Sequence, residues 1–196
     1  MSNQDSAASL YKQALKLATL HPESTGEYVL LLRKSANCGF PEAQYAIASL
    51  YLHGRGVRKS YVKAFPFLLS SAKNGISAAC FDLGVCYELG QGTEIDKRKA
   101  FTSYRKGAML NDHDSQCEIA RCYYFGIGSN VNYAAAANWY LKAAKAGVPE
   151  AQFSIGRMYE FAEGVKYNLR KARFWYKRSA SNGDVRAIRA LDVTKQ

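Results

Sequence analysis

A histidine and two cysteines in the second half of the sequence are the side chains best suited to metal chemistry. His113 and Cys117 are four residues apart, which would place them on one face of a helix, and Cys122 follows five residues later. Zinc binds imidazole and thiolate, but a structural site needs four ligands, and the sequence supplies neither a fourth ligand nor a Cys-x-x-Cys pair. We therefore expect a buried thiol and a histidine at a helix start, with no metal and no other cofactor.

Catalytic chemistry has little support from the residue types. The three histidines, His21, His53 and His113, are widely separated, and none belongs to a serine, aspartate or cysteine pattern that would pair a nucleophile with a base. No glycine-rich phosphate loop follows a strand-like segment. The sequence therefore predicts no catalytic residue and no enzyme.

The composition is that of a folded and strongly basic chain. Of the 196 residues, 48% are hydrophobic and 13% are aromatic, which excludes an intrinsically disordered chain. The 27 Lys and Arg residues against 16 Asp and Glu residues give a net charge of +11. Acidic proteins, nucleic acid and anionic membrane surfaces are therefore all candidate partners.

The compartment is predicted from what the sequence does not contain. The amino-terminal residues lack the basic and apolar stretches of an export signal, and no apolar run approaches the ~20 residues that a membrane span needs. The five cysteines are odd in number and irregularly spaced, as in a chain whose thiols stay reduced. We expect a cytoplasmic protein without a transmembrane segment, and the sequence carries no indication of its oligomeric state.

A period of 36 residues organises nearly the whole sequence. It relates Tyr51, Tyr87, Tyr123 and Tyr159, which we interpret as core residues between helices and not as a ladder for stacking a ligand. Such a period indicates a repeat protein in which each unit packs on its neighbours. Columns of small residues keep the same period: Ala36, Ala72, Ala108, Ala144 and Ala180; Ala64, Ala100, Ala136 and Ala172; Gly39, Gly75, Gly147 and Gly183, with Asn111 in the remaining place.

Each repeat is predicted to contain two helices. The first carries a stripe of small and apolar residues and ends at a glycine turn such as Gly54–Gly56. The second begins after a residue whose side-chain oxygen can cap a helix, and it ends at the glycine column that begins with Gly39. The cap column comprises Ser60, Asp96, Asn132 and Asn168, and it extends upstream to a capping box at Ser24 and Glu27.

The register divides the chain into repeats. Residues 1–196 are predicted to form one solenoid domain, in which Pro66 should kink a helix or delay its start. The divisions are a degenerate leading repeat at 5–39, full repeats at 40–75, 76–111, 112–147 and 148–183, and a capping helix at 184–196.

The last two full repeats carry a family resemblance. Residues 150–159 read Glu-Ala-Gln-Phe-Ser-Ile-Gly-Arg-Met-Tyr, and residues 171–183 read Lys-Ala-Arg-Phe-Trp-Tyr-Lys-Arg-Ser-Ala-Ser-Asn-Gly. Together with Ala136–Gly147, these strings resemble the Sel-1-like repeat. Ala162 and Asn111 depart from its glycine pattern. The resemblance implies an all-α, right-handed α-solenoid of stacked antiparallel helix pairs, similar to tetratricopeptide proteins, that acts as a scaffold or adaptor.

The resemblance also implies where a partner binds. In tetratricopeptide-like solenoids the first helices line a concave groove, and aromatic residues with arginines are typical of interface hot spots. An extended peptide or a protein surface with acidic and apolar side chains would suit that groove, although the column that contains Tyr45 could instead be buried between first helices. The predicted partner-binding residues are Tyr45, Phe81, Arg121, Tyr124, Phe125, Phe153, Arg157 and Phe161.

Two other functions are weaker alternatives. Basic residues in the loops and second helices could bind RNA or an anionic surface. No charged column of the first helices repeats, however, so we do not expect nucleic acid as a partner. Some secreted, disulfide-bonded members of the family bind or weakly hydrolyse β-lactams. Those members carry two regularly spaced cysteines in each repeat, which this sequence does not.

Overall fold

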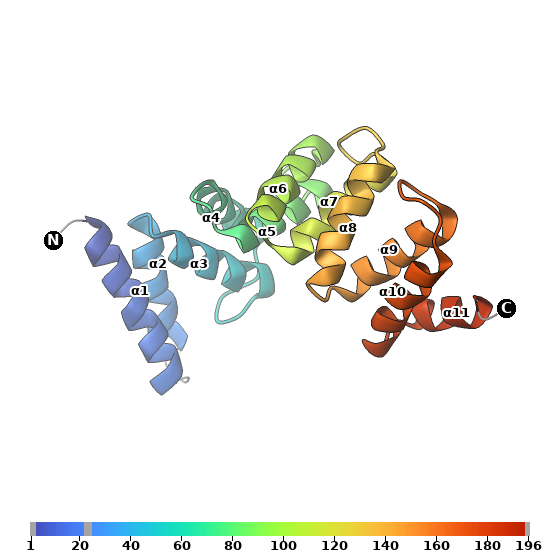
Figure 1. Cartoon of the computed structure of the whole chain (residues 1–196). Coiled ribbons are helices and arrows are strands. Elements are labelled where there is room, and N and C mark those ends of the chain that lie inside the picture. The colour runs from blue at the N-terminus through green and yellow to red at the C-terminus, as the bar shows by residue number, and fades with distance from the viewer. Residues whose placement is uncertain (1–2, 22–24, 195–196) are drawn as a thin grey trace. The chain divides into compact units, whose positions relative to one another are not determined.

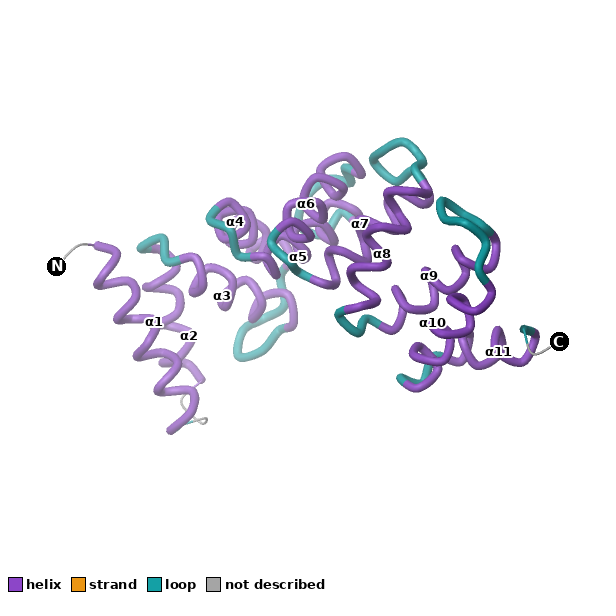
Figure 2. Tube along the Cα trace, in the orientation of Figure 1, coloured by secondary structure: helices purple, strands orange, loops and turns teal. Residues whose placement is uncertain are grey.

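The computed structural model describes residues 3–21 and 25–194, and all regular secondary structure in these ranges is helical (Figures 1 and 2). The predicted all-α fold of sequential helix pairs with a 36-residue period is confirmed. Contacts divide the chain into two compact units, Met1–Ser103 and Tyr104–Gln196, with the boundary inside α6 (Lys97–Met109). The handedness and the single-domain organisation stay predictions. Among the described helices, none has the length and hydrophobicity needed to cross a bilayer.

The first unit is built of helices that each pack against the next along the chain (Figure 1). Its core is a continuous cluster that includes Leu32, Ile47, Leu68 and Leu83, all buried. Its complete helices are α1 (Asn3–Leu20), α2 (Thr25–Asn37), α3 (Pro41–His53), α4 (Tyr61–Lys73) and α5 (Ser77–Leu89).

The second unit repeats this packing after the end of α6. Its core includes Ala120, Ala144, Ile155 and Met158, and a smaller cluster around Tyr176 joins its last helices. Its complete helices are α7 (His113–Phe125), α8 (Tyr133–Lys145), α9 (Pro149–Phe161), α10 (Leu169–Ser181) and α11 (Val185–Val193).

The small-residue columns lie where helices pack closely, because only small side chains let two backbones approach. Ala64, Ala100, Ala136 and Ala172 are all fully buried. Gly156 on α9 is a further example, since a Cβ there would lie 2.7 Å from the ring of Tyr176 on α10. The alanine excess of the sequence is therefore a packing property.

The second helices begin where the cap column predicts. Ser60 Oγ accepts a hydrogen bond from the backbone N–H of Lys63 at 3.3 Å, and the corresponding bonds to Asp96, Asn132 and Asn168 are all 2.9 Å long. Ser24 lies outside the described residues. Pro66 lies within α4, which still begins at Tyr61 directly after the Ser60 cap, so a delayed start at this proline is wrong.

Left-handed residues end the helices. The first helices α3, α5 and α7 end at Gly54, Gly90 and Gly126, which all have φ near +70°. Ala162 takes the same conformation after α9, with a φ of 57°, and Asn111 takes it after α6, with a φ of 63°. The two departures from the glycine pattern therefore keep the turn geometry.

The tyrosine column packs against the cores, as interpreted from the sequence. Tyr51 is buried, while Tyr87, Tyr123 and Tyr159 are half-buried against their clusters. The Tyr51 hydroxyl accepts a hydrogen bond from Arg33 at 2.9 Å and not from a backbone group. The four backbone carbonyls of this column accept the N–H groups of the cap residues Ser60, Asp96, Asn132 and Asn168 at 2.8–2.9 Å.

Candidate functional site

A pocket of about 140 Å³ in the second unit is the candidate functional site. It lies over α9, which contributes its middle wall, with α7 on one side and α11 on the other. Its rim carries charged and aromatic side chains, and its floor is formed by Tyr140 and Met158, both buried. The lining residues from α7 to α9 are Arg121, Tyr124, Phe125, Tyr140, Glu150, Phe153, Ser154, Arg157 and Met158, and Glu163 and Arg186 complete the lining.

The structure brings most of the predicted partner-binding residues together here. Arg121, Tyr124, Phe125, Phe153 and Arg157 all line the pocket. The sixth, Phe161, is exposed one helical turn beyond Arg157, whose guanidinium lies 5.7 Å from the centre of its ring.

Two of the predicted residues lie in the first unit and do not line this pocket. Tyr45 on α3 is half-buried and packs against the first core, and Phe81 on α5 is half-buried. Part of the Tyr45 ring is therefore covered by its own core, and its role in partner binding stays a prediction.

Two arginines at the same repeat position have different surroundings. Arg121 on α7 forms an ion pair of 2.7 Å with Glu118, three residues before it on the same helix. Ser154 occupies the position of Glu118 on α9. Arg157 is exposed and has no carboxylate partner among the described residues. The charge of Arg157 is therefore available to an anionic group at the pocket rim.

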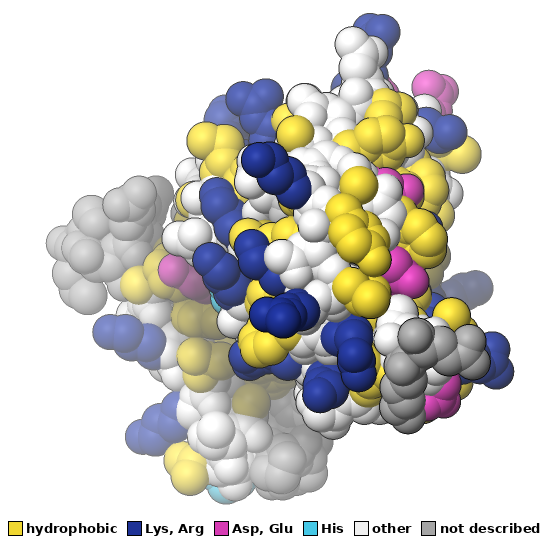
Figure 3. All heavy atoms as spheres, turned by 45° about the vertical axis from the view of Figure 1, so that its right-hand side comes forward, with side chains coloured by type: hydrophobic (Ala, Val, Ile, Leu, Met, Phe, Trp, Pro, Cys, Tyr) yellow, Lys and Arg dark blue, Asp and Glu magenta, His cyan; other side chains and the backbone are white. Residues whose placement is uncertain are grey.

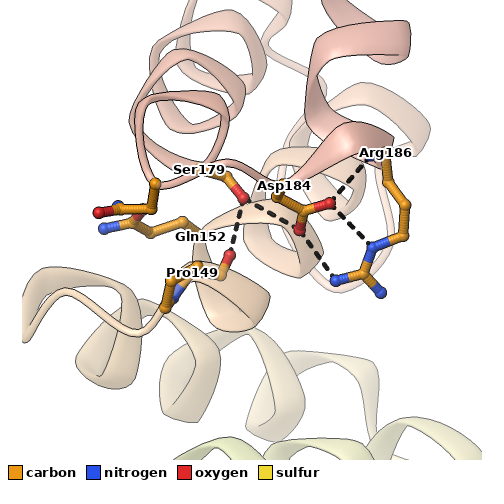
Figure 4. A network of polar contacts seen from close by, with 6 residues as sticks. Pro149, Gln152, Ser179, Asp184 and Arg186 are labelled. Carbon is orange, nitrogen blue, oxygen red and sulfur yellow. Dashed lines mark hydrogen bonds and ion pairs between the residues drawn. The ribbon is translucent and has the colours of Figure 1, made fainter.

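A polar network fixes the third arginine of the rim (Figure 4). Asp184 caps α11 and also accepts two hydrogen bonds from the Arg186 guanidinium, at 2.9 and 3.1 Å. Ser179 on α10 donates to the Pro149 carbonyl at 2.9 Å and also contacts Asp184 at 3.2 Å. The hydrogen bonds from Arg186 hold the pKa of Asp184 below its ordinary value.

The position of Arg186 follows from this network. Its guanidinium is held 4.7 Å from the centre of the Phe153 ring, a cation–π contact that makes α11 one wall of the pocket.

Tyrosine–carboxylate hydrogen bonds hold the end of α9 and the loop that follows it. The Tyr124 hydroxyl donates to Glu163 Oε1 at 2.9 Å, and the Tyr176 hydroxyl donates to Glu160 Oε2 at 2.5 Å. Burial raises the pKa of both tyrosines, and the two hydrogen bonds raise it further because each stabilises the neutral phenol. These hydroxyls therefore act as donors that fix the rim and do not ionise near neutral pH.

Glu150, Glu163 and Arg186 are pocket residues that the sequence analysis missed. Arg186 and Glu150 are one repeat apart, in the column that also holds Asp114 and Glu42, so the period could have identified them together. Arg186 lies on the predicted capping helix, and α11 packs in the register of a first helix, with Ala187 fully buried in its core column. Glu163 has no such signal, because Ile127 and Gln91 occupy its place in earlier repeats.

The candidate metal ligands do not gather into a site. His113 is exposed at the start of α7 and contacts Gln116, while Cys117 and Cys122 are buried. Burial raises the pKa of the Cys117 thiol, which opposes the thiolate form that metals bind. Within residues 3–21 and 25–194, no three His, Cys, Asp or Glu side chains form a group that could hold a metal ion.

Basic side chains spread over much of the face that Figure 3 turns forward, with hydrophobic side chains between them and few carboxylates. Several lysines also have packing roles. Lys63, Lys99 and Lys171, each three residues after a cap, lie 5.1–5.9 Å from the ring centres of Tyr51, Tyr87 and Tyr159. Part of the positive charge therefore stabilises the repeats themselves.

Comparison with known proteins gives a direct assignment of the repeats. The Sel1 repeat pattern matches residues 41–76, 77–112, 113–148 and 149–184, well over half of the chain. These ranges are the four full repeats of the sequence analysis, shifted by one residue.

Solved structures show the same fold. A protective antigen of uropathogenic Escherichia coli with an SLR fold is 26% identical, with a TM-score of 0.88 over 96% of this chain and 41% of its own. A Sel1 repeat protein from Oxalobacter formigenes is 31% identical, with a TM-score of 0.77 over 85% of this chain and 48% of its own. An immunity protein from Pseudomonas aeruginosa is 24% identical, with a TM-score of 0.53 over 93% of this chain and 68% of its own. The chain thus spans less than half the length of the first two proteins.

Proposed function

The chain belongs to the Sel1 repeat family, and from this membership we propose that it is a non-enzymatic scaffold that binds a peptide segment or protein surface over α9. The partner carries carboxylates and apolar side chains. The observation that carries the proposal is the exposed Arg157, without a carboxylate partner in the described chain, beside a pocket flanked by the exposed rings of Phe125 and Phe161.

Physical chemistry supports this reading of the pocket. Exposed aromatic rings lose unfavourable contact with water when a partner covers them, and arginine adds a directional, charge-assisted hydrogen bond. Phe125 is 63% exposed and Phe161 is 59% exposed, so both rings can be covered by a partner without rearrangement of the core. The Tyr124–Glu163 and Arg186–Asp184 contacts hold the rim in place before binding, which lowers the entropic cost of association.

The experiment is affinity capture from an extract of the source cells, with the retained proteins quantified by mass spectrometry. The test variant combines Arg157→Glu with Phe125→Ala. The matched control combines Arg98→Glu with Leu69→Ala, which alters two exposed residues of the first unit. We expect the test variant to lose a set of proteins that the control retains, with equal helical circular dichroism for both. Equal capture by both variants would contradict the proposal.

Two further assays separate this function from the alternatives. Binding to RNA or anionic vesicles through the basic surface would fall steeply with salt, and a mobility shift at low salt that is lost at high salt would favour that function instead. Hydrolysis of a chromogenic β-lactam above the rate in buffer would contradict the non-enzymatic assignment.

We also propose a reducing, cytoplasmic compartment. Support comes from the thiols, since Cys80, Cys86, Cys117 and Cys122 are buried and free, and Cys38 is exposed and free. Thiol labelling of protein taken directly from cells would test this assignment, with labelling of Cys38 without prior reduction as the expected result.

A further inference from the structure

Four side chains of α9 form a stripe along the pocket face. Glu150, Phe153, Arg157 and Phe161 follow one another at intervals of three or four residues, so they lie on one side of the helix. In order, the stripe offers a carboxylate, a ring, a guanidinium and a second ring. Glu150 and Arg157 are both exposed. Arg157 forms no ion pair within the described part of the chain, whereas the Glu150 carboxylate acts on the Arg186 guanidinium of the same pocket and helps to raise its pKa.

The helix α7 of the preceding repeat has similar residues at three of these four positions but a different pairing of its arginine. Asp114, Cys117, Arg121 and Phe125 occupy the equivalent positions, and Glu118 neutralises Arg121. Because Ser154 replaces Glu118 in the next repeat, the stripe on α9 keeps Glu150 and Arg157 two helical turns apart, and the second carboxylate of α9, Glu160, accepts the Tyr176 hydroxyl. Of these two helices, only α9 thus has an arginine on this stripe with no carboxylate three residues before it.

We propose that the partner segment bound over α9 is an α-helix that packs along it. Its basic residue lies opposite Glu150, its acidic residue opposite Arg157, and its apolar residues opposite Phe153 and Phe161. This inference rests on the proposed function and adds the conformation and the charge order of the partner.

The spacing of the two charges distinguishes a helix from an extended segment. Glu150 and Arg157 are seven residues apart on α9, which corresponds to about 10.5 Å along its axis at about 1.5 Å per residue. A second helix places residues seven apart at the same interval and on one face. An extended chain covers about 10 Å in three residues, and residues three apart point to opposite sides. Residues on one side of an extended chain are two or four apart, at about 6.7 or 13 Å. Residues seven apart on a helix, at about 10.5 Å, therefore match the interval between the two charges of α9 more closely.

The pocket walls fit the side of a helix. The pocket of about 140 Å³ accepts one apolar side chain between the Tyr124–Phe125 pair of α7 and the contact of Arg186 on α11 with Phe153 on α9. Its floor of Tyr140 and Met158 is buried, so the inserted side chain reaches the apolar core of the unit. This is the arrangement by which amphipathic helices are held in grooves, through anchors at helical intervals.

The test is selection from a phage-displayed library of random 16-residue peptides on the intact chain, followed by fluorescence anisotropy with the enriched peptides. We expect enriched sequences to carry a basic and an acidic residue seven apart, with apolar residues between and beyond them. Arg157→Glu should weaken binding of such a peptide about tenfold or more, and replacing the acidic residue of the peptide by arginine should restore it.

A second variant tests the charge of Arg157 without removing it. Ser154→Glu recreates on α9 the pair that Glu118 and Arg121 form on α7. Both Ser154→Glu and Ser154→Gln enlarge a side chain that lines the pocket, but only glutamate pairs with Arg157, so Ser154→Glu should weaken the same peptide more than Ser154→Gln does. Circular dichroism of each bound peptide should report helix.

The outcomes are separable from those of the proposed function. The helical partner would be overturned by enriched peptides that bind through Arg157 but lack the seven-residue charge pair or do not form a helix. If those peptides are acidic and apolar, the scaffold function would still stand. No enriched peptide that depends on Arg157 would also overturn the helical partner, and the capture experiment would then decide the scaffold function alone. A concentration-dependent dimer of the chain that is lost in Arg157→Glu would show that this face binds a second copy of the chain. That result would overturn the separate partner helix.

Discussion

The Arg121 guanidinium and the Glu118 carboxylate form a 2.7 Å ion pair on the exposed side of α7, with both side chains about one quarter exposed. The pair spans three residues of one helix, and such pairs stabilise a helix by about 0.3–0.5 kcal/mol. Transfer of the pair to α9 by Ser154→Glu should therefore raise the free energy of unfolding by a similar amount. Urea unfolding at low salt and at ~1 M salt would measure this gain in stability, which should vanish at high salt because the ion pair is screened. The gain should also be absent in the Ser154→Glu, Arg157→Gln double variant, which lacks the positive partner.

Ala162 and Asn111 occupy left-handed positions at which other repeats have glycine. An alanine at positive φ costs about 1–2 kcal/mol in backbone strain, and asparagine costs less because it tolerates this region. We expect Ala162→Gly to raise the urea midpoint, and Asn111→Gly to raise it by a smaller amount. A lowered midpoint for Ala162→Gly would show that the loss of the methyl group outweighs the relief of strain.

Gly164 and Gly183 both have positive φ, but their surroundings differ. A Cβ on Gly164 would lie 2.2 Å from the backbone carbonyl carbon of Tyr133, whereas a Cβ on Gly183 would meet no atom within 4 Å. Gly183→Ala should therefore cost only the strain of about 1–2 kcal/mol. Gly164→Ala should cost at least about 1 kcal/mol more, because the start of α8 and the loop that follows α9 must separate. Equal midpoints for the two variants in urea would contradict this packing.

The Asp184–Arg186 pair makes the stability of the second unit depend on pH. The pKa of Asp184 is lowered in the folded chain, so its contribution to stability is complete above the unfolded value of about 3.9 and is lost as the pH falls through the folded value. Wild-type protein should lose thermal stability on this account only below about pH 4, and Asp184→Asn should show a smaller loss over the same range. Thermal melts of both proteins between about pH 6 and pH 2.5 would compare the slopes.

Much of the fold follows from short-range signals in the sequence. The cap residues Ser60, Asp96, Asn132 and Asn168 act within one helical turn, and the glycine turns act within a few residues, so each could be identified without knowledge of the tertiary structure. The 36-residue period then placed the same elements in every repeat. Pro66 was harder to assess because its cost competes with a good cap and a buried face, including Leu68, that together keep α4 intact.

The candidate site was only partly predictable, since its properties depend on contacts between helices. The period identified Arg121 and Arg157 as equivalent, yet their difference comes from the residue three positions earlier. Arg186 was missed because its place on the pocket depends on the network with Asp184 and Ser179 (Figure 4). Tyr45 was selected by its column, and its contact with the first core reflects packing that a column alone does not specify.

The backbone carbonyls of the tyrosine column set the number of residues in the loops between paired helices. In each full repeat the carbonyl of the column tyrosine accepts the N–H of the residue nine positions later, so the loop is closed at both ends and has a set number of residues. Surface loops ordinarily tolerate insertions, but an insertion here would displace the cap residue from its carbonyl and move the following helix out of register. Related sequences should therefore gain or lose whole repeats more readily than single residues within these loops.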